Sequence, residues 1–215
     1  MDAQTLLRQQ WQQMLQSRSI DPDKNDQLFA NLIRAYNKRS RNYHNPEHLA
    51  DMFRHFERHW PHLSNPDLVA AAIFFHDVIY NPARRDNEVK SAEYAAKKLP
   101  ILGFSPEETR IVCDYILATQ KHELPENARP DLAWLLDFDL AILGSDWKTY
   151  QEYTQKIRRE YQVYPDILYK PGRRKAMEHF LRRATIFHTA TFRELFEIQA
   201  RSNIKREIDF SAKNQ

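Results

Sequence analysis

The sequence predicts an all-α protein, and three observations support this fold class. Only three of the 215 residues are glycine, which argues against a glycine-rich β-protein and against a phosphate-binding glycine loop. No stretch sustains the alternation of polar and apolar residues that is typical of a half-buried strand. Ala, Leu, Glu, Lys, Arg and Gln, which favour helices, are abundant. We therefore expect a helical bundle.

The expected helices follow one another without a low-complexity linker or an internal repeat. Apolar residues at helical spacing predict helices over 3–17 and 22–37. Asn-Pro and Ser-Pro start signals predict helices from Asn45 toward Trp60, from Asn65 to about Tyr80 and from Ser105 to about Lys121. The remaining helices are expected at 87–99, 131–143, 146–161, 173–187 and 191–209. This organisation predicts a single domain over 1–215.

Charge, cysteine content and hydropathy narrow the class of protein. A net charge of +3 gives little reason to expect nucleic-acid binding, and basic groups such as Arg158-Arg159, Arg173-Arg174-Lys175 and Arg182-Arg183 read as exposed helix faces. The single Cys113 allows no internal disulfide and is expected in the core. No apolar run approaches the ~18 residues of a membrane span, and no signal peptide is apparent. We expect a cytoplasmic protein.

A buried acidic group is predicted at the end of the segment 68–75, which is apolar on every face. This segment runs directly into His76-Asp77. A carboxylate there lies in apolar surroundings and at the negative end of the helix dipole. It therefore needs a positive partner, which is either a metal ion or an arginine such as Arg84 or Arg85.

Two further features point to the same chemistry. The apolar run 134–143 contains Asp137 and Asp139, which lie on roughly opposite faces of a helix, so only one of them can face a shared internal site. Neither apolar run contains a Lys or Arg that would compensate a buried carboxylate. His44 directly precedes a helix N-cap and can supply a nitrogen ligand. Imidazole and carboxylate groups together suit Mn²⁺, Ni²⁺, Fe²⁺, Co²⁺, Zn²⁺ or Mg²⁺.

The order His44, His76-Asp77, Asp139 resembles the HD-domain superfamily of metal-dependent phosphohydrolases, which are helical and bind a divalent metal through this pattern. The similarity covers about 36–145, with C-terminal helices at about 145–209, and thus implies one HD-type domain. The residues that carry it are Arg41-Asn42-Tyr43-His44-Asn45 with His48, Phe75-His76-Asp77-Val78-Ile79-Tyr80, Asp86-Asn87-Glu88 with Ser91, and Asp137-Phe138-Asp139-Leu140 through Gly144.

The resemblance implies that the metal ligands are His44, His76, Asp77 and Asp139, with Asp137 as the alternative to Asp139. It also implies that Asp77 contacts a metal-bound water as a proton acceptor. Glu88, which can equally be a plain helix-start carboxylate, is the candidate second catalytic acid. The candidate substrate-binding residues are Arg41, His48 and His122. Each of them also has a structural interpretation as a loop, helix or helix-end residue.

The expected activity is metal-dependent hydrolysis of a phosphoester of a small metabolite or nucleotide. The alternative is an HD-fold module that binds a nucleotide or phosphometabolite without turnover. A small phosphorylated substrate is the expected partner, no membrane is expected, and the sequence is compatible with a homo-oligomer. His55, His59 and His62 form a local cluster that is expected to be a solvated helix face rather than a zinc site.

Overall fold

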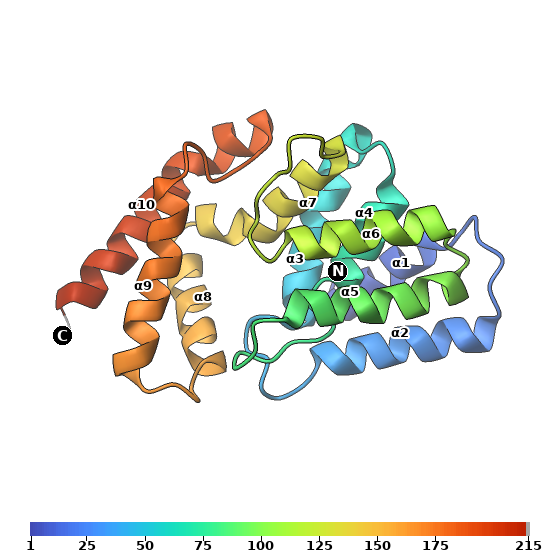
Figure 1. Cartoon of the computed structure of the whole chain (residues 1–215), viewed down its shortest axis with the longest axis horizontal. Helices are drawn as coiled ribbons and strands as arrows, with labels where there is room; N and C mark the ends of the chain where they lie inside the picture. Colours follow the sequence, from blue (N-terminus) through green and yellow to red (C-terminus); the bar gives the residue numbers. More distant parts are fainter. Residues whose placement is uncertain (214–215) are drawn as a thin grey trace. The chain divides into compact units, whose positions relative to one another are not determined.

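The structure is a computed structural model that describes residues 1–213. Every regular element within these residues is a helix, which confirms the all-α prediction (Figure 1). The chain divides into two compact units, Met1–Phe138 and the residues from Asp139 onward. One HD-type domain over 1–215 stays a prediction. None of the described helices is both long and apolar enough to span a membrane.

The first unit is built from seven α-helices, the last of which runs two residues beyond Phe138. Short 3-10 helices extend two of them, η1 after α3 and η2 after α5. The elements are α1 (Ala3–Met14), α2 (Pro22–Tyr36), α3 (Pro46–His59), η1 (Trp60–His62), α4 (Pro66–Phe75), α5 (Asn87–Lys98), η2 (Leu99–Leu102), α6 (Pro106–Ala118) and α7 (Pro130–Leu140).

Helix α4 is the centre of the first unit. Every residue of 68–75 is buried, and α4 packs against α1, α3, α5 and α6 (Figure 1). The ring of Phe74 meets Trp11 edge-on at 5.1 Å between ring centroids and lies 4.7 Å from Phe53. Burial of this many large apolar side chains, each contributing ~1.5–3 kcal/mol, fixes α4 firmly within the unit.

The predicted start signals form the expected caps. Asn45 Oδ1 accepts hydrogen bonds from the backbone N–H groups of Glu47 and His48 at the start of α3. Ser105 and Glu108 form a reciprocal capping box on α6. These caps satisfy N–H groups that the first helical turn leaves without an intrahelical partner.

The prediction that the fourth helix reaches Tyr80 is wrong, because α4 ends at Phe75. The N–H groups of His76 and Val78 still bond to the carbonyls of Ala72 and Phe75, but other main-chain groups beyond Phe75 bond to side chains. The Arg41 guanidinium donates to the carbonyls of Asp77 and Val78, and the Tyr36 hydroxyl accepts from the N–H of Asp77. Such long-range partners are invisible in a local helix signal.

The second unit contains η3 (Ala141–Gly144), α8 (Trp147–Glu160), α9 (Asp166–Arg182) and α10 (Ala190–Lys213). Helix α10 packs against η3 and α9. Helix α9 begins at Asp166 rather than at 173, and it contains Pro171. It ends at Arg182 rather than 187, and α10 extends past 209 to Lys213.

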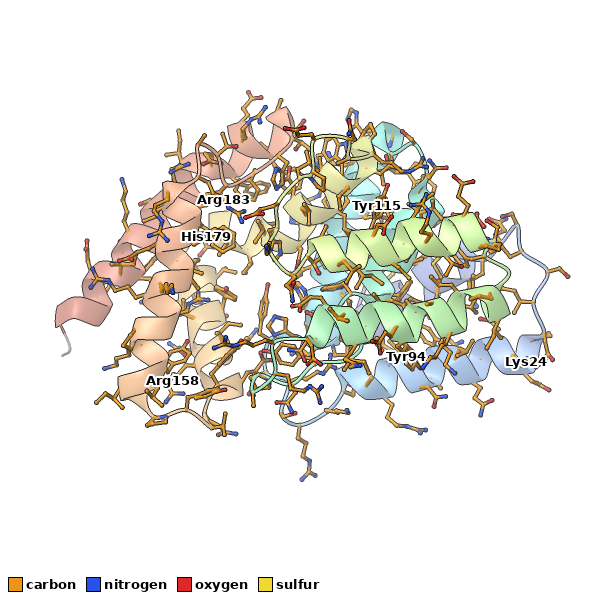
Figure 2. All side chains as sticks on the ribbon, in the orientation of Figure 1. Lys24, Tyr94, Tyr115, Arg158, His179 and Arg183 are labelled. Atoms are coloured by element: carbon orange, nitrogen blue, oxygen red, sulfur yellow. The ribbon has the colours of Figure 1, made fainter. Side chains whose placement is uncertain are left out.

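Polar contacts also hold the helices of the second unit together. Arg173 is largely buried, pairs with Glu207 at 2.7 Å and donates to the Tyr153 hydroxyl at 3.1 Å, so it is not the exposed residue that was expected. Arg158, which is labelled in Figure 2, bonds to Asp166 and to the carbonyls of Tyr161 and Tyr164. Two of the predicted basic surface residues therefore brace the unit.

Candidate metal site

The candidate site lies at the buried end of α4. His76 and Asp77 follow this helix directly and are 1% and 8% exposed. His76 Nδ1 lies 2.9 Å from the carbonyl oxygen of Ile73. Because a carbonyl can only accept, Nδ1 carries the proton and Nε2 keeps a lone pair. The end of the helix thus presents one nitrogen ligand and one carboxylate close together. A histidine with its proton on Nδ1 is the tautomer that can bind a metal ion through Nε2.

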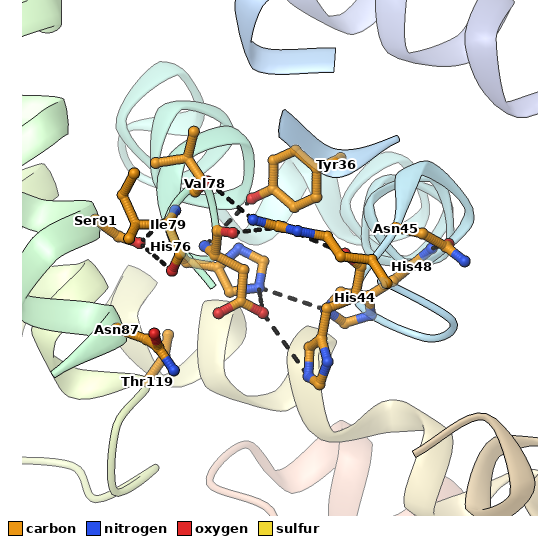
Figure 3. A network of polar contacts seen from close by, with 12 residues as sticks. Tyr36, His44, Asn45, His48, His76, Val78, Ile79, Asn87, Ser91 and Thr119 are labelled. Atoms are coloured by element: carbon orange, nitrogen blue, oxygen red, sulfur yellow. Dashed lines mark hydrogen bonds and ion pairs between the residues drawn. The ribbon is translucent and has the colours of Figure 1, made fainter. Parts of the chain in front are cut away.

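His48 brings a second nitrogen to the same place. It lies in the first turn of α3, where Asn45 caps the helix, and is 3% exposed. Its Nε2 is 3.4 Å from Nε2 of His76, and Figure 3 shows the two rings converging. His48, His76 and Asp77 each offer a ligand atom, and these atoms all lie within 4.8 Å of one another. This buried group could hold a metal ion.

His44 is placed beside the group by the loop before α3. Its Nε2 lies 3.9 Å from Asp77 Oδ2, and its side chain keeps 21% of its surface exposed. The ring rests on Tyr80 with 4.3 Å between ring centroids. Three histidines from two segments therefore lie around one carboxylate (Figure 3).

Two of the donor spacings match those around a transition-metal ion or zinc. Ligand atoms bound at ~2.1 Å lie about 3.0 Å apart at right angles and about 3.4 Å apart in a tetrahedron. The corresponding distances are 3.4 Å between His48 Nε2 and His76 Nε2 and 3.3 Å between His76 Nε2 and Asp77 Oδ2. Two or three imidazoles with one carboxylate suit Zn²⁺, Co²⁺, Ni²⁺, Fe²⁺ or Mn²⁺ better than Ca²⁺.

Neither Arg84 nor Arg85, the arginines considered as partners of Asp77, pairs with its carboxylate. Arg84 makes a two-bond pair with Asp86 at 2.8 and 2.7 Å, and Arg85 is exposed. Arg41 approaches Asp77 but binds its main-chain carbonyl rather than its carboxylate. The carboxylate faces His44 and His76 instead.

A frame of hydrogen bonds fixes the turn that follows Asp77. Ser91 Oγ accepts from the N–H of Ile79 and donates to its carbonyl. The Asn87 side chain pairs in the same two-way manner with the backbone of Asn81, at 3.0 Å for each bond. Helix α5 thereby holds the segment after the ligands in place (Figure 3).

Glu88 lies in the first turn of α5, and His122 lies just after the end of the neighbouring helix α6. Glu88 is half-buried and accepts a hydrogen bond of 3.4 Å from Gln120. Burial raises the pKa of Glu88, and the charge of Asp77 raises it further. His122 follows α6 with φ 51°, a left-handed conformation that side chains rarely adopt and that is often found at functional sites.

The two acidic residues of α7 differ in their surroundings. Asp137 is fully buried within the first unit. Asp139 is half-buried and is the first residue of the second unit. The assignment of Asp139 as a ligand, with Asp137 as the alternative, stays a prediction.

Sequence reasoning placed His48 on the substrate side rather than among the candidate ligands. The sequence feature that indicates a shared site is the position of His48 four residues after His44, in the first turn of a helix whose start is fixed by the Asn45 cap. The direction of its ring depends on how α3 packs against α4, which no local pattern encodes. Among the described residues no second group of three or more such side chains could hold a metal.

The histidine cluster on α3 and η1 stacks on aromatic rings, with His62 exposed to solvent and His55 and His59 half-buried. His59 and His62 stack on Trp134 at 5.0 and 5.2 Å between ring centroids, and His55 stacks on Phe138 at 6.4 Å. Burial, followed by the nearby charges of Arg58 and His59, lowers the pKa of His55 to about 4. These rings attach α7 to α3.

Comparison with models of protein families, with curated proteins and with solved structures found no match to this chain.

Proposed function

We propose that the protein is a divalent-metal-dependent phosphohydrolase that acts on a phosphoester of a small metabolite or nucleotide. The observation that carries the proposal is the convergence of His48, His76 and Asp77 at the buried end of an apolar helix. Burying a carboxylate is costly unless a cation compensates it. When bound there, a divalent metal lowers the pKa of a water ligand and polarises a phosphoryl oxygen.

The chain's own residues have distinct roles in this proposal. His48, His76 and Asp77 hold the metal, and His44 completes its ligands within the first unit. The apolar core around α4 excludes bulk water from the back of the site, which strengthens electrostatic interactions there. Glu88, whose pKa is raised by burial, exchanges a proton with the reacting groups. His122 contacts the phosphate.

The direct test is a hydrolysis assay on the purified full chain after loading with Mn²⁺, Co²⁺, Ni²⁺ or Zn²⁺ in turn. A panel of nucleotides and sugar phosphates is expected to include a substrate from which phosphate is released only by the metal-loaded protein. A loaded protein that binds a nucleotide but releases no phosphate from any member would replace the hydrolase with a binding module. A protein that binds none of these metals would contradict both the hydrolase and the binding module.

Glu88 offers a test of the chemistry separate from metal binding. Glu88→Gln keeps the shape and the contact with Gln120 but cannot exchange a proton. We expect kcat to fall about 10²–10⁴-fold, while the bound metal measured by elemental analysis stays at the wild-type level.

The matched control is Glu93→Gln on the same helix, where the exposed carboxylate pairs with Lys90. It is expected to leave kcat unchanged. An unchanged kcat in Glu88→Gln as well would assign Glu88 to a purely structural helix-start role.

A further inference from the structure

Arg41 joins the two chain segments that supply the candidate ligands. Its Nη1 donates to the carbonyl of Asp77 at 2.7 Å and to the carbonyl of His44 at 3.3 Å, and its Nη2 donates to Val78 at 2.9 Å. One guanidinium thus bridges the loop before α3 and the turn after α4. These segments are far apart in the sequence, and their relative position sets the distance between the ligands.

The surroundings of Arg41 are those of a structural cation. The side chain is 5% exposed, and its guanidinium carbon lies 4.8 Å from the ring centroid of Tyr36 and 5.4 Å from that of Tyr80. The negative end of the α4 dipole favours a cation at this place. Within the described residues Arg41 makes no ion pair, and its charge is met by carbonyl dipoles and aromatic faces.

A phosphate clamp needs the fork of the guanidinium to face the substrate. Here the terminal nitrogens are occupied by main-chain carbonyls, and the buried Nε has no hydrogen-bond partner among the described residues. The donors of Arg41 therefore point into the protein rather than toward an opening.

We propose that Arg41 is a positioning residue that sets the distance between His44 and Asp77 in the metal site, and that it does not bind the substrate phosphate. The inference rests on the metal site of the proposed function but not on hydrolysis. Tyr80 contributes to the same arrangement, since its ring lies near both the Arg41 guanidinium and the His44 ring. A lysine cannot replace Arg41, because one ammonium lacks the planar fork that spans several carbonyls.

The test is Co²⁺ binding by Arg41→Lys in the full chain. We expect Co²⁺ affinity to fall about 10–100-fold, as for other residues that orient metal ligands. The visible absorption bands of the bound Co²⁺ should also change, because the ligand geometry relaxes. The melting temperature of the metal-free variant should stay within a few degrees of the wild-type value.

Arg39→Lys is the matched control, since Arg39 lies in the same loop and is exposed. It should leave both the affinity and the spectrum unchanged. If Arg41→Lys does not fold, Arg41→Gln, which keeps two N–H donors, is measured in the same way.

Three distinguishable results would contradict the positioning role of Arg41, the hydrolase function, or both. Wild-type affinity and spectrum in Arg41→Lys, with a raised KM for a phosphoester, would return Arg41 to the role of a clamp. A wild-type protein that binds Co²⁺ but hydrolyses nothing overturns the hydrolase and leaves the positioning role to be decided by the variant spectra. A wild-type protein that binds no Co²⁺ overturns both.

Discussion

Asp77→Asn is expected to lower the affinity for Mn²⁺ or Co²⁺ by at least about 100-fold, more than the loss typical of residues that only orient ligands. The amide keeps the shape of the side chain but removes the negative charge that faces His44 and His76. Metal bound to the native state alone stabilises it by ~2.7 kcal/mol at a hundredfold excess over Kd. The wild-type melting temperature should therefore rise by about 5–10 °C with metal, and that of Asp77→Asn should not.

The metal-free proteins provide an independent check of the same idea. Without metal, the buried carboxylate is a cost to the native state, so Asp77→Asn should melt at the wild-type temperature or above it. The control is Asp114→Asn, which removes an exposed carboxylate whose pair with Arg110 is worth little. If metal raises the melting temperature of Asp77→Asn as much as that of the wild type, the ion binds elsewhere.

The burial of His76 and Asp77 could be predicted from the sequence, because it follows from the residues that directly precede them. An apolar segment of helical length must be buried, and a carboxylate at its end must then be compensated. The structure confirms the burial of 68–75 and the position of both residues at the end of α4. The hydrophobic pattern and the charge at its edge are sufficient to predict this burial.

The role of His48 and the partners of Arg41 could not be predicted in the same way. Both depend on how α3 and the loop before it pack against the end of α4. Arg41 reads as a free cation in a basic loop, yet in the fold it is 5% exposed and bonded to main-chain carbonyls. Sequence patterns predict which face of a helix is buried, but they do not predict which side chains of different helices come together.

The bounds of α9 show a second limit. A proline and a glycine in succession read as a helix break, although Pro171 lies in the second turn of a helix that starts at Asp166. A proline in the second turn removes one intrahelical hydrogen bond, so it carries the cost of a proline inside the helix. Packing of α9 against α10 and the Arg173–Glu207 pair outweigh this cost.

Gly144→Ala is expected to destabilise the protein by about 2–4 kcal/mol, because the site has no room for a methyl group. A Cβ at this position would lie 2.5 Å from Cβ of Phe196 and 3.0 Å from its Cα, so helix α10 itself would have to move. The Asn203 side chain opposes such a movement by donating to the carbonyls of Leu143 and Ser145 at 2.9 and 2.8 Å. Thermal unfolding should show a fall of about 5–15 °C.

Gly172→Ala is the matched control, since a Cβ added there meets no atom within 4 Å. In the interior of α9 this change should stabilise the protein by about 0.5–1 kcal/mol, because alanine loses less backbone entropy than glycine on folding. The two substitutions add the same methyl group. Their expected changes in the free energy of unfolding have opposite signs only because α10 lies close to the turn 141–144. Equal melting temperatures for the two variants would therefore show that this approach is absent in solution.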